Sequence, residues 1–137
     1  MIKAFVDTSV ILRLLVKDDE AKIRASENLI RNAKERGVIL YLLPVAVLEI
    51  VWVLEKLYKF NKKTIREIVE AILNTPELKC ELAGVLLNAV RDYEEKNIKF
   101  ADAVMGHWGL ERGFSTVYTY DEKDFKRIAG LKVTPVQ

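Results

Sequence analysis

The stretch IKAFVDTSVILRLL, residues 2–15, decides the fold that this sequence predicts. Its first part, Ile2–Val6, is a short and mostly apolar run that is typical of a buried strand. The residues from Ser9 onward have the length and the apolar spacing of a helix. A strand followed directly by a helix is the unit from which α/β proteins are built. Asp7, at the junction, leaves two interpretations open, a cap of the helix or a ligand of a metal ion.

Strands and helices continue to alternate along the rest of the chain. Apolar runs predict further strands at residues 38–43, 78–80, 115–120 and 132–136. Apolar residues at helical spacing predict helices at residues 21–36, 44–59, 61–75, 82–96 and 100–112, and a short helix or turn at 121–130. Because the strands are apolar and alternate with helices, we predict a three-layer α/β domain around a mainly parallel central sheet flanked by helices.

The composition indicates a single domain and restricts the metal chemistry. With 137 residues, of which 50% are hydrophobic and 31% charged, the chain fits one compact domain over residues 1–137. The single cysteine, Cys80, excludes an internal disulfide, and the single histidine, His107, leaves too few soft ligands for a zinc site. Any metal site must therefore use oxygen ligands. The net charge of +2 permits nucleic acid as a partner without requiring it.

The N-terminal segment does not resemble a membrane anchor or a secretion signal. Its apolar stretch is interrupted by Asp7 and Arg13, so it is too short and too charged to span a bilayer. It also lacks a cleavage site of small residues. We therefore expect a cytoplasmic protein without a membrane partner.

Four acidic residues fall where such a sheet would bring them together. Asp7 follows the first strand, Glu49 lies in the early turns of the helix after the second, and Asp121 follows the strand at 115–120. Asp102 lies in the first turn of the helix that leads into that strand. Because parallel strands end at the same edge of a sheet, we expect the four carboxylates to converge on one rim.

Each acid also has a purely structural interpretation. Asp7, Asp102 and Asp121 are residues favoured as helix caps, and DEKD resembles a capping box in which Asp124 is the partner of Asp121. Glu49 lies off the apolar stripe of its helix but between apolar neighbours, which is also compatible with a surface position at an apolar interface. The local sequence does not decide between these interpretations.

Convergence of the four acids favours a bound cation. Like charges within about 4 to 6 Å raise one another's pKa and destabilise the fold unless a positive charge lies among them. A helix N-terminus supplies only about half a charge. Hard oxygen ligands fit Mg²⁺ or Mn²⁺, and such ions recruit phosphate oxygens of a substrate. Hydrolysis of a phosphodiester is therefore the reaction that this set of residues favours.

The segments that carry these acids resemble the PIN-domain ribonucleases, in particular the VapC-like toxins of prokaryotic toxin–antitoxin pairs. Each segment is similar to one of the four acidic motifs of the family, and the four occur in the family's order. The segments are FVDTSVIL at 5–12, PVAVLEIVWVLEKLYKF at 44–60, FADAVMGHWGLERG at 100–113 and VYTYDEKDF at 117–125. The resemblance covers essentially the whole chain.

The resemblance implies a parallel sheet with helices on both sides, an acidic pocket for one or two Mg²⁺ or Mn²⁺ ions, and endonucleolytic cleavage of RNA. It also implies a homodimer and inhibition by a small antitoxin protein. In the family's pattern the hydroxyls of Thr8, Ser9 and Thr119 would support the pocket through hydrogen bonds, with Asp124 nearby.

From these residues we derive a hypothesis for the reaction. Asp7, Asp102 and Asp121 hold the metal, directly or through water, and Glu49 orients or deprotonates the attacking water. The alternative is a PIN-like module that binds RNA or protein without cleaving. A small-molecule phosphatase of the haloacid-dehalogenase type is disfavoured, because no second acid stands two residues after Asp7.

Other polar and aromatic residues near these motifs are given structural interpretations first. His107 is predicted to be a packed or partly exposed helix residue rather than a general base. Trp52 and Trp108 are predicted to pack in the core or at a dimer interface, with stacking on bases as the alternative. Four basic residues close to the acids are predicted to be exposed, with steering of a phosphate backbone as the alternative. They are Arg13, Lys99, Lys123 and Lys126.

Overall fold

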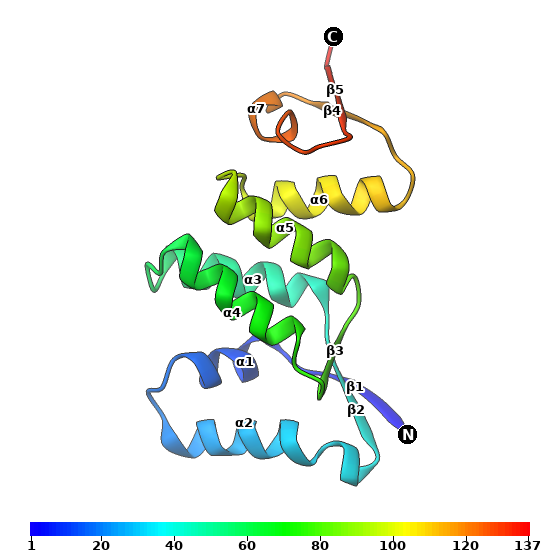
Figure 1. The fold of residues 1–137 in the computed structure, drawn as a ribbon. Helices are drawn as coiled ribbons and strands as arrows, with labels where there is room; N and C mark the ends of the chain where they lie inside the picture. The colour runs from blue at the N-terminus through cyan, green and yellow to red at the C-terminus, as the bar shows by residue number, and fades with distance from the viewer. The chain divides into compact units, whose positions relative to one another are not determined.

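The structure is a computed structural model that describes all residues from Met1 to Gln137. It contains seven α-helices, one short 3₁₀ helix and five β-strands (Figure 1). The chain forms two compact units. The first unit comprises residues 1–59 and 71–81, and the second comprises residues 60–70 and 82–137.

The first unit is built on a sheet of three parallel strands in the order β1-β2-β3. Ile2 is aligned with Val38, and Leu40 with Leu78. Parallel neighbours need a crossover connection, which two helices provide between β1 and β2. The elements are β1 (Ile2–Phe5), α1 (Thr8–Leu15), α2 (Glu20–Asn32), the 3₁₀ helix η1 (Lys34–Arg36), β2 (Val38–Leu42), α3 (Pro44–Lys56) and β3 (Leu78–Cys80).

Local sequence signals fix the helix ends of this unit. Asp7 is the N-cap residue of α1, and Pro44 is the first residue of α3, where its missing N–H would have no helical partner. Gly37 ends η1 with a φ of 75°, a left-handed conformation that glycine adopts without steric cost. Leu42 of β2 and Ile50 of α3 are fully buried. The predicted strand and helix at 38–59 are thus confirmed, with the helix ending slightly earlier.

The predicted strand at Ile2–Val6 is present as β1, but the prediction that it is buried is wrong for most of its length. The side chains of Ile2 and Phe5 are both 68% exposed. β1 is hydrogen-bonded to β2 only, so it forms an edge of this sheet. An edge strand has a neighbour on one side only and its side chains receive less cover.

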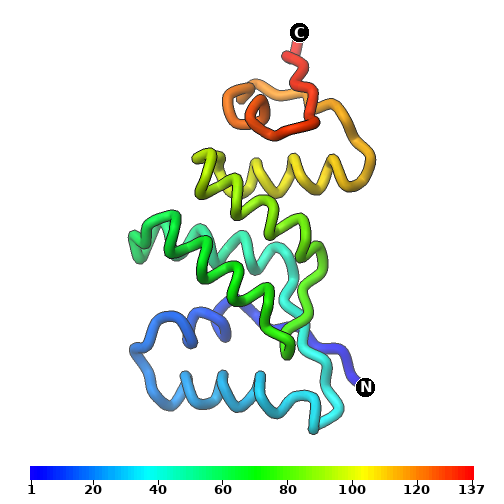
Figure 2. Tube along the Cα trace, in the orientation of Figure 1, coloured from blue at the N-terminus to red at the C-terminus, as the bar shows by residue number.

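The second unit combines packed helices with a pair of strands. α5 and α6 lie side by side, and Figure 2 shows the chain turning back between them. β4 and β5 pair in parallel, with Thr116 aligned with Lys132 and Thr119 with Pro135. The elements are α5 (Ala83–Glu95), α6 (Phe100–Glu111), β4 (Thr116–Thr119), α7 (Glu122–Phe125) and β5 (Lys132–Pro135). α4 (Lys62–Leu73) begins in this unit and ends in the first.

Apolar contacts between α5 and α6 form the core of the second unit. The ring of Tyr93 on α5 packs edge-on against Phe100, the first residue of α6, with ring centroids 6.0 Å apart. Leu86 of α5 and Ala103 of α6 are fully buried. The core therefore holds the first turn of α6, and this turn carries Asp102.

All strand pairs are parallel, as the sequence predicts, but hydrogen bonds join the strands into two sheets, one in each unit. β4 finds a parallel partner in β5 because α7 and the loop after it carry the chain back in the same direction. No helix combines the length and the apolar character needed to cross a bilayer. The expectation that residues 1–137 act as a single domain stays a prediction.

Candidate metal centre

Three carboxylates of the second unit lie close together. Asp102 is the third residue of α6, Asp121 lies between β4 and α7, and Asp124 lies within α7. One oxygen of each carboxylate lies within 4.8 Å of the others. The sequence singled out all three, Asp102 and Asp121 as metal ligands and Asp124 as a supporting residue.

Neither Asp102 nor Asp121 caps a helix with its side chain. The N-cap residue of α6 is Lys99, so Asp102 lies three residues further along, in the first turn. Asp121 is the N-cap residue of α7, but its side chain accepts no capping bond. Its backbone N–H instead donates to Oγ1 of Thr119, 2.8 Å away. The capping interpretation is therefore wrong for these two residues, and both carboxylates are available to a ligand.

Asp124 is held by the protein through both of its oxygens. The residue is 6% exposed. Its Oδ2 accepts a hydrogen bond from the backbone N–H of Lys99 at 3.1 Å, and its Oδ1 accepts one from Nη2 of Arg127 at 2.8 Å. The capping box suggested by DEKD does not form, because the N–H of Asp121 donates to Thr119 rather than to Asp124.

The electrostatic surroundings separate Asp102 from Asp124. Burial raises the pKa of Asp102, and the negative charges of Asp124 and Asp121 raise it further, while Lys99 offsets only part of this. For Asp124, burial also acts to raise the pKa, but the hydrogen bonds from Lys99 and Arg127 outweigh it, so the pKa is lowered. The cluster thus contains a carboxylate without a matching positive charge, which a cation would supply.

The donor set fits a hard divalent cation. All three groups are carboxylates, which suit Mg²⁺ and Mn²⁺ rather than zinc. Ligand oxygens about 2.1 Å from one Mg²⁺ ion lie up to about 4.2 Å apart, close to the spacing in the cluster. Lys99 stands at the edge of the cluster, with Nζ 4.0 Å from Oδ2 of Asp121 and a side chain that is 77% exposed, as predicted for this residue.

Asp7, in the first unit, does cap its helix. Its Oδ2 accepts hydrogen bonds from Oγ of Ser9 at 2.8 Å and from the backbone N–H of Ser9 at 3.4 Å. The bonds from Ser9 lower the pKa of Asp7. The capping interpretation is confirmed here, and because both bonds go to one oxygen of an exposed side chain, it does not exclude metal binding.

Glu49 is exposed on α3. Its neighbours one turn before and one turn after it, Val45 and Trp52, are 61% and 56% exposed, so Trp52 is not a core residue. β1 and β2 are parallel neighbours, and Asp7 and the start of α3 follow their carboxyl ends. Asp7 and the start of α3 therefore lie at the same edge of the first sheet, and Glu49 is in the second turn of that helix. The convergence of Asp7 and Glu49 with the acids of the second unit stays a prediction.

Two of the three hydroxyl residues expected to support the site form hydrogen bonds beside its acids. Ser9 donates to Asp7, and Thr119 accepts from the N–H of Asp121. Oγ1 of Thr8 is buried and has no hydrogen-bond partner. A buried hydroxyl without a partner is costly, and the part of Thr8 in the site stays a prediction.

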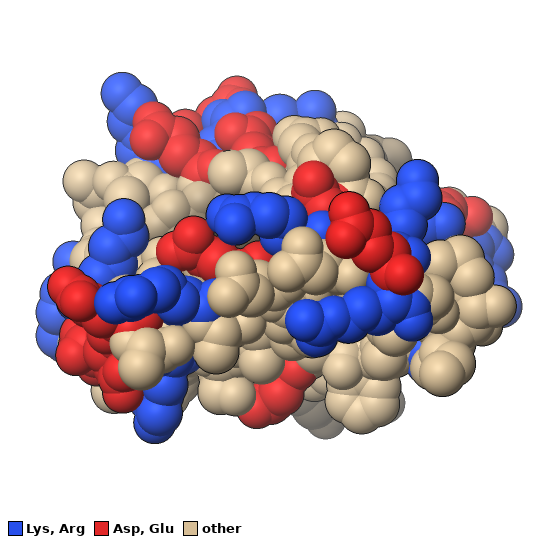
Figure 3. All heavy atoms as spheres, turned by 90° about the horizontal axis from the view of Figure 1, so that it is seen from below, with Lys and Arg blue, Asp and Glu red and all other residues tan.

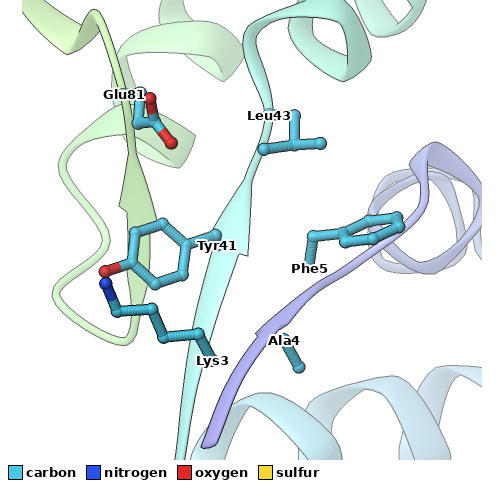
Figure 4. Close-up of a pocket in the computed structure, with 6 residues that line it drawn as sticks. All are labelled: Lys3, Ala4, Phe5, Tyr41, Leu43 and Glu81. Carbon is cyan, nitrogen blue, oxygen red and sulfur yellow. The ribbon is translucent and has the colours of Figure 1, made fainter.

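A hollow of about 450 Å³ lies on the sheet of the first unit, and none of the predicted acids lines it. Figure 4 shows Lys3 reaching toward Tyr41 within it, with Nζ 5.9 Å from the centre of the ring. The six residues that line it are Lys3, Ala4, Phe5, Tyr41, Leu43 and Glu81. Since neither Asp7 nor Glu49 lines this hollow, it is not part of the candidate metal centre.

His107 is engaged in a pair that the sequence did not reveal. Its Nε2 lies 2.6 Å from Oδ2 of Asp92, which is 3% exposed on α5. The side chain of His107 is 15% exposed on α6, so the prediction of a packed or partly exposed helix residue is confirmed. Charges elsewhere are mixed in sign: on the face drawn in Figure 3, basic and acidic side chains are interspersed among other residues.

Comparisons with known proteins identify similar chains. This chain matches the PIN domain family over residues 4–131. It is 26% identical over 132 residues to the VapC ribonuclease of Aquifex aeolicus (strain VF5), and the match covers 96% of each protein. Among solved structures it is similar to VapBC2 from Rickettsia felis bound to a DNA fragment from their promoter. That likeness has 17% identity and a TM-score of 0.37, and covers 100% of both chains.

Proposed function

Because this chain belongs to the PIN-domain family, we propose that it is a metal-dependent endoribonuclease and the toxin of a toxin–antitoxin pair. The family match also confirms the predicted family and its three-layer α/β class. The observation that carries the proposal is the acid cluster of the second unit, where Asp102, Asp121 and Asp124 lie within 4.8 Å of one another. A cluster of this kind at a strand end is suited to hold Mg²⁺ or Mn²⁺ against a phosphate.

In this proposal, the acids divide the work of the reaction. Asp7, Asp102 and Asp121 would hold the ion, directly or through water. Glu49 would orient or deprotonate the attacking water. When bound, a divalent cation polarises the scissile phosphate and lowers the pKa of the water. Lys99, exposed beside Asp121, is placed to meet a phosphate oxygen of the RNA strand.

The substrate and partners in this proposal come from the relatives. The similar protein of Aquifex aeolicus is called a VapC ribonuclease, and this chain matches it over 96% of its length. That name supports RNA as the substrate. From the resemblance to the VapC-like toxins we also propose a small antitoxin as the inhibitor and a homodimer as the assembly. The family match spans residues of both units, which supports one functional domain over residues 1–137. The exposed Val45 and Trp52 around Glu49 are compatible with a partner interface.

The test is a cleavage assay on mixed cellular RNA with Mg²⁺, with Mn²⁺ and with a chelator. Asp102→Asn keeps the size of the side chain and removes its charge, and we expect it to abolish cleavage. Glu111→Gln is the matched control, because Glu111 is an exposed acid at the other end of the same helix. Cleavage that persists in chelator and in Asp102→Asn would contradict the proposal. Retained RNA binding without cleavage by the unaltered protein would instead favour a non-catalytic PIN-like module.

A further inference from the structure

We propose that Asp124 and Arg127 form a positioning pair, which holds the first turn of α6 so that Asp102 faces Asp121, and that Asp124 is not itself a ligand of the metal. The inference rests on the proposed function, since it assigns a task to residues around the same cluster. The sequence analysis did not point to Arg127. This side chain contacts the acid cluster through its hydrogen bond to Asp124.

The guanidinium of Arg127 joins several separate segments. Nη2 donates to Oδ1 of Asp124 at 2.8 Å and to the carbonyl oxygen of Asn97 at 3.3 Å. Nη1 donates to the carbonyl oxygen of Lys96, the C-cap residue of α5, and Nε donates to that of Lys123 at 3.3 Å. Arginine is suited to this task because its planar group carries five donors in a fixed geometry. One side chain thus ties the end of α5 to α7.

Asp124 extends this connection to α6. Its Oδ2 accepts the N–H of Lys99, the N-cap residue of that helix, whose own side chain makes no capping bond. The first N–H groups of a helix lack partners within the helix and need an acceptor from elsewhere. Asp124 is such an acceptor, 25 residues away in sequence. Because Asp102 lies three residues after Lys99, the place of its carboxylate depends on this bond.

Apolar packing supports the same arrangement. Phe125 and Ile128, on either side of Arg127, are 5% and 1% exposed. Ile128 packs closely on Gly106 of α6, where an added Cβ would lie 2.5 Å from its Cδ1. Gly106 is one helical turn after Asp102 and on the same face of α6. The segment around Arg127 therefore contacts the face of α6 that carries the proposed ligand.

The bonds of Asp124 set it apart from the other two acids. Both of its oxygens are occupied by donors of the protein, and its side chain is 8% exposed. Asp121 is 49% exposed, and its nearest cation is the Nζ of Lys99 at 4.0 Å. A metal ion that recruited Asp124 would have to share an oxygen that already accepts a hydrogen bond from Arg127 or from the N–H of Lys99. Asp121 requires no such sharing, and the side-chain hydrogen-bond partner of Asp102 is Asp124 itself, within the cluster.

The test measures Mn²⁺ affinity on the full chain, from the electron paramagnetic resonance signal of free Mn²⁺, alongside RNA cleavage and thermal unfolding. We expect Arg127→Gln and Asp124→Asn each to weaken Mn²⁺ binding about tenfold, the size of effect found for residues that orient metal ligands. If the pair acts as a unit, the double variant binds Mn²⁺ about as well as either single variant. Arg112→Gln is the control, since Arg112 is an exposed arginine at the end of α6.

Several outcomes overturn the inference. One is Mn²⁺ affinity that Arg127→Gln leaves unchanged. Another is a loss of Mn²⁺ affinity in Asp124→Asn that is as large as the loss in Asp102→Asn and that adds to the loss in Arg127→Gln. If Arg127→Gln does not fold, Arg127→Lys keeps the charge without the planar fork, and Mn²⁺ affinity equal to wild type there overturns the inference as well. Mn²⁺ binding without RNA cleavage contradicts the proposed function alone. No Mn²⁺ binding by the unaltered protein contradicts both.

Discussion

Asp7 in the first unit and Asp102 in the second both lie at the start of a helix, yet they are held in opposite ways. Asp7 is exposed, and the side-chain and backbone bonds from Ser9 lower its pKa. Asp102 is half-buried, and burial together with the charges of Asp124 and Asp121 raises its pKa. An isolated carboxylate at a helix start accepts hydrogen bonds from nearby donors. A carboxylate that lies among two others instead faces negative charges that disfavour its ionised form.

This difference separates two tasks that look alike in the sequence. Asp7 stabilises α1 by itself, and any role in metal binding is added to that task. Asp102 makes no capping bond, and its neighbours oppose its charge. A capped acid is compatible with a structural role alone. An uncapped acid next to two others fits the cation that we propose for this cluster.

The largest effect should come from substituting each of the two acids in the cleavage assay. We expect Asp7→Asn and Asp102→Asn each to lower the rate of RNA cleavage by at least about a hundredfold. Substitution of residues that only hydrogen-bond to metal ligands already lowers activity by up to about that factor. Asparagine is a good helix cap, so Asp7→Asn should keep α1 intact. If Asp102→Asn is inactive and Asp7→Asn is not, the acids of the two units do not act in one site.

A smaller effect should appear in the pH dependence of stability without metal. The folded-state pKa of Asp102 lies above the ordinary value of 3.8, so its contribution to stability is present at low pH and is lost as the pH rises through that folded-state pKa. The folded-state pKa of Asp7 lies below 3.8, so its contribution is present above that value and is lost as the pH falls through the folded-state pKa.

Unfolding midpoints measured in chelator from about pH 3 to pH 6 check this contrast. As the pH rises, the unfolding midpoint of the wild type should fall relative to that of Asp102→Asn. Over the same range, the midpoint of the wild type should rise relative to that of Asp7→Asn. If the midpoints of the two variants change with pH in the same way, the surroundings of Asp7 and Asp102 do not differ as described.

The smallest effect concerns the packing beneath Asp102. In Gly106→Ala, the new methyl group meets Cδ1 of Ile128, and overpacking of this kind costs about 1 to 3 kcal/mol. Alanine has a higher helix propensity than glycine, which stabilises the helix by about 1 kcal/mol. We therefore expect a net loss of about 1 kcal/mol in the free energy of unfolding. Gly84→Ala on α5 is the matched control, because nothing lies within 4 Å of the added Cβ. Urea denaturation should therefore show a loss for the first and a gain for the second, and equal gains would contradict the close packing on Ile128.

Much of the fold could be predicted because its signals are local. Pro44 at the start of α3, Gly37 after η1 and Asn61 as a cap of α4 all act within a few residues of their own position. The exposure of β1 could not be predicted from its apolar sequence. It depends on which strands pair with it, and that is a property of the whole sheet.

The candidate site was predictable as a set of acids but not as a network. Strand ends and the family motifs pointed to Asp102 and Asp121. The bond between the N–H of Lys99 and Asp124 joins residues 25 positions apart, and the pair of His107 and Asp92 joins residues 15 positions apart on two helices. Such contacts depend on how helices pack, which spacing along one helix does not reveal.

The central claim is that the cluster around Asp102 needs a cation, and the most direct measurement is the unfolding midpoint as a function of Mg²⁺ concentration. An ion that binds only the folded chain stabilises it by about 2.7 kcal/mol at a hundredfold excess over its dissociation constant. We predict that Mg²⁺ raises the midpoint of the wild type and of Glu111→Gln, and that Asp102→Asn loses most of the rise. An equal rise in Asp102→Asn, or no rise in the wild type, would contradict the account.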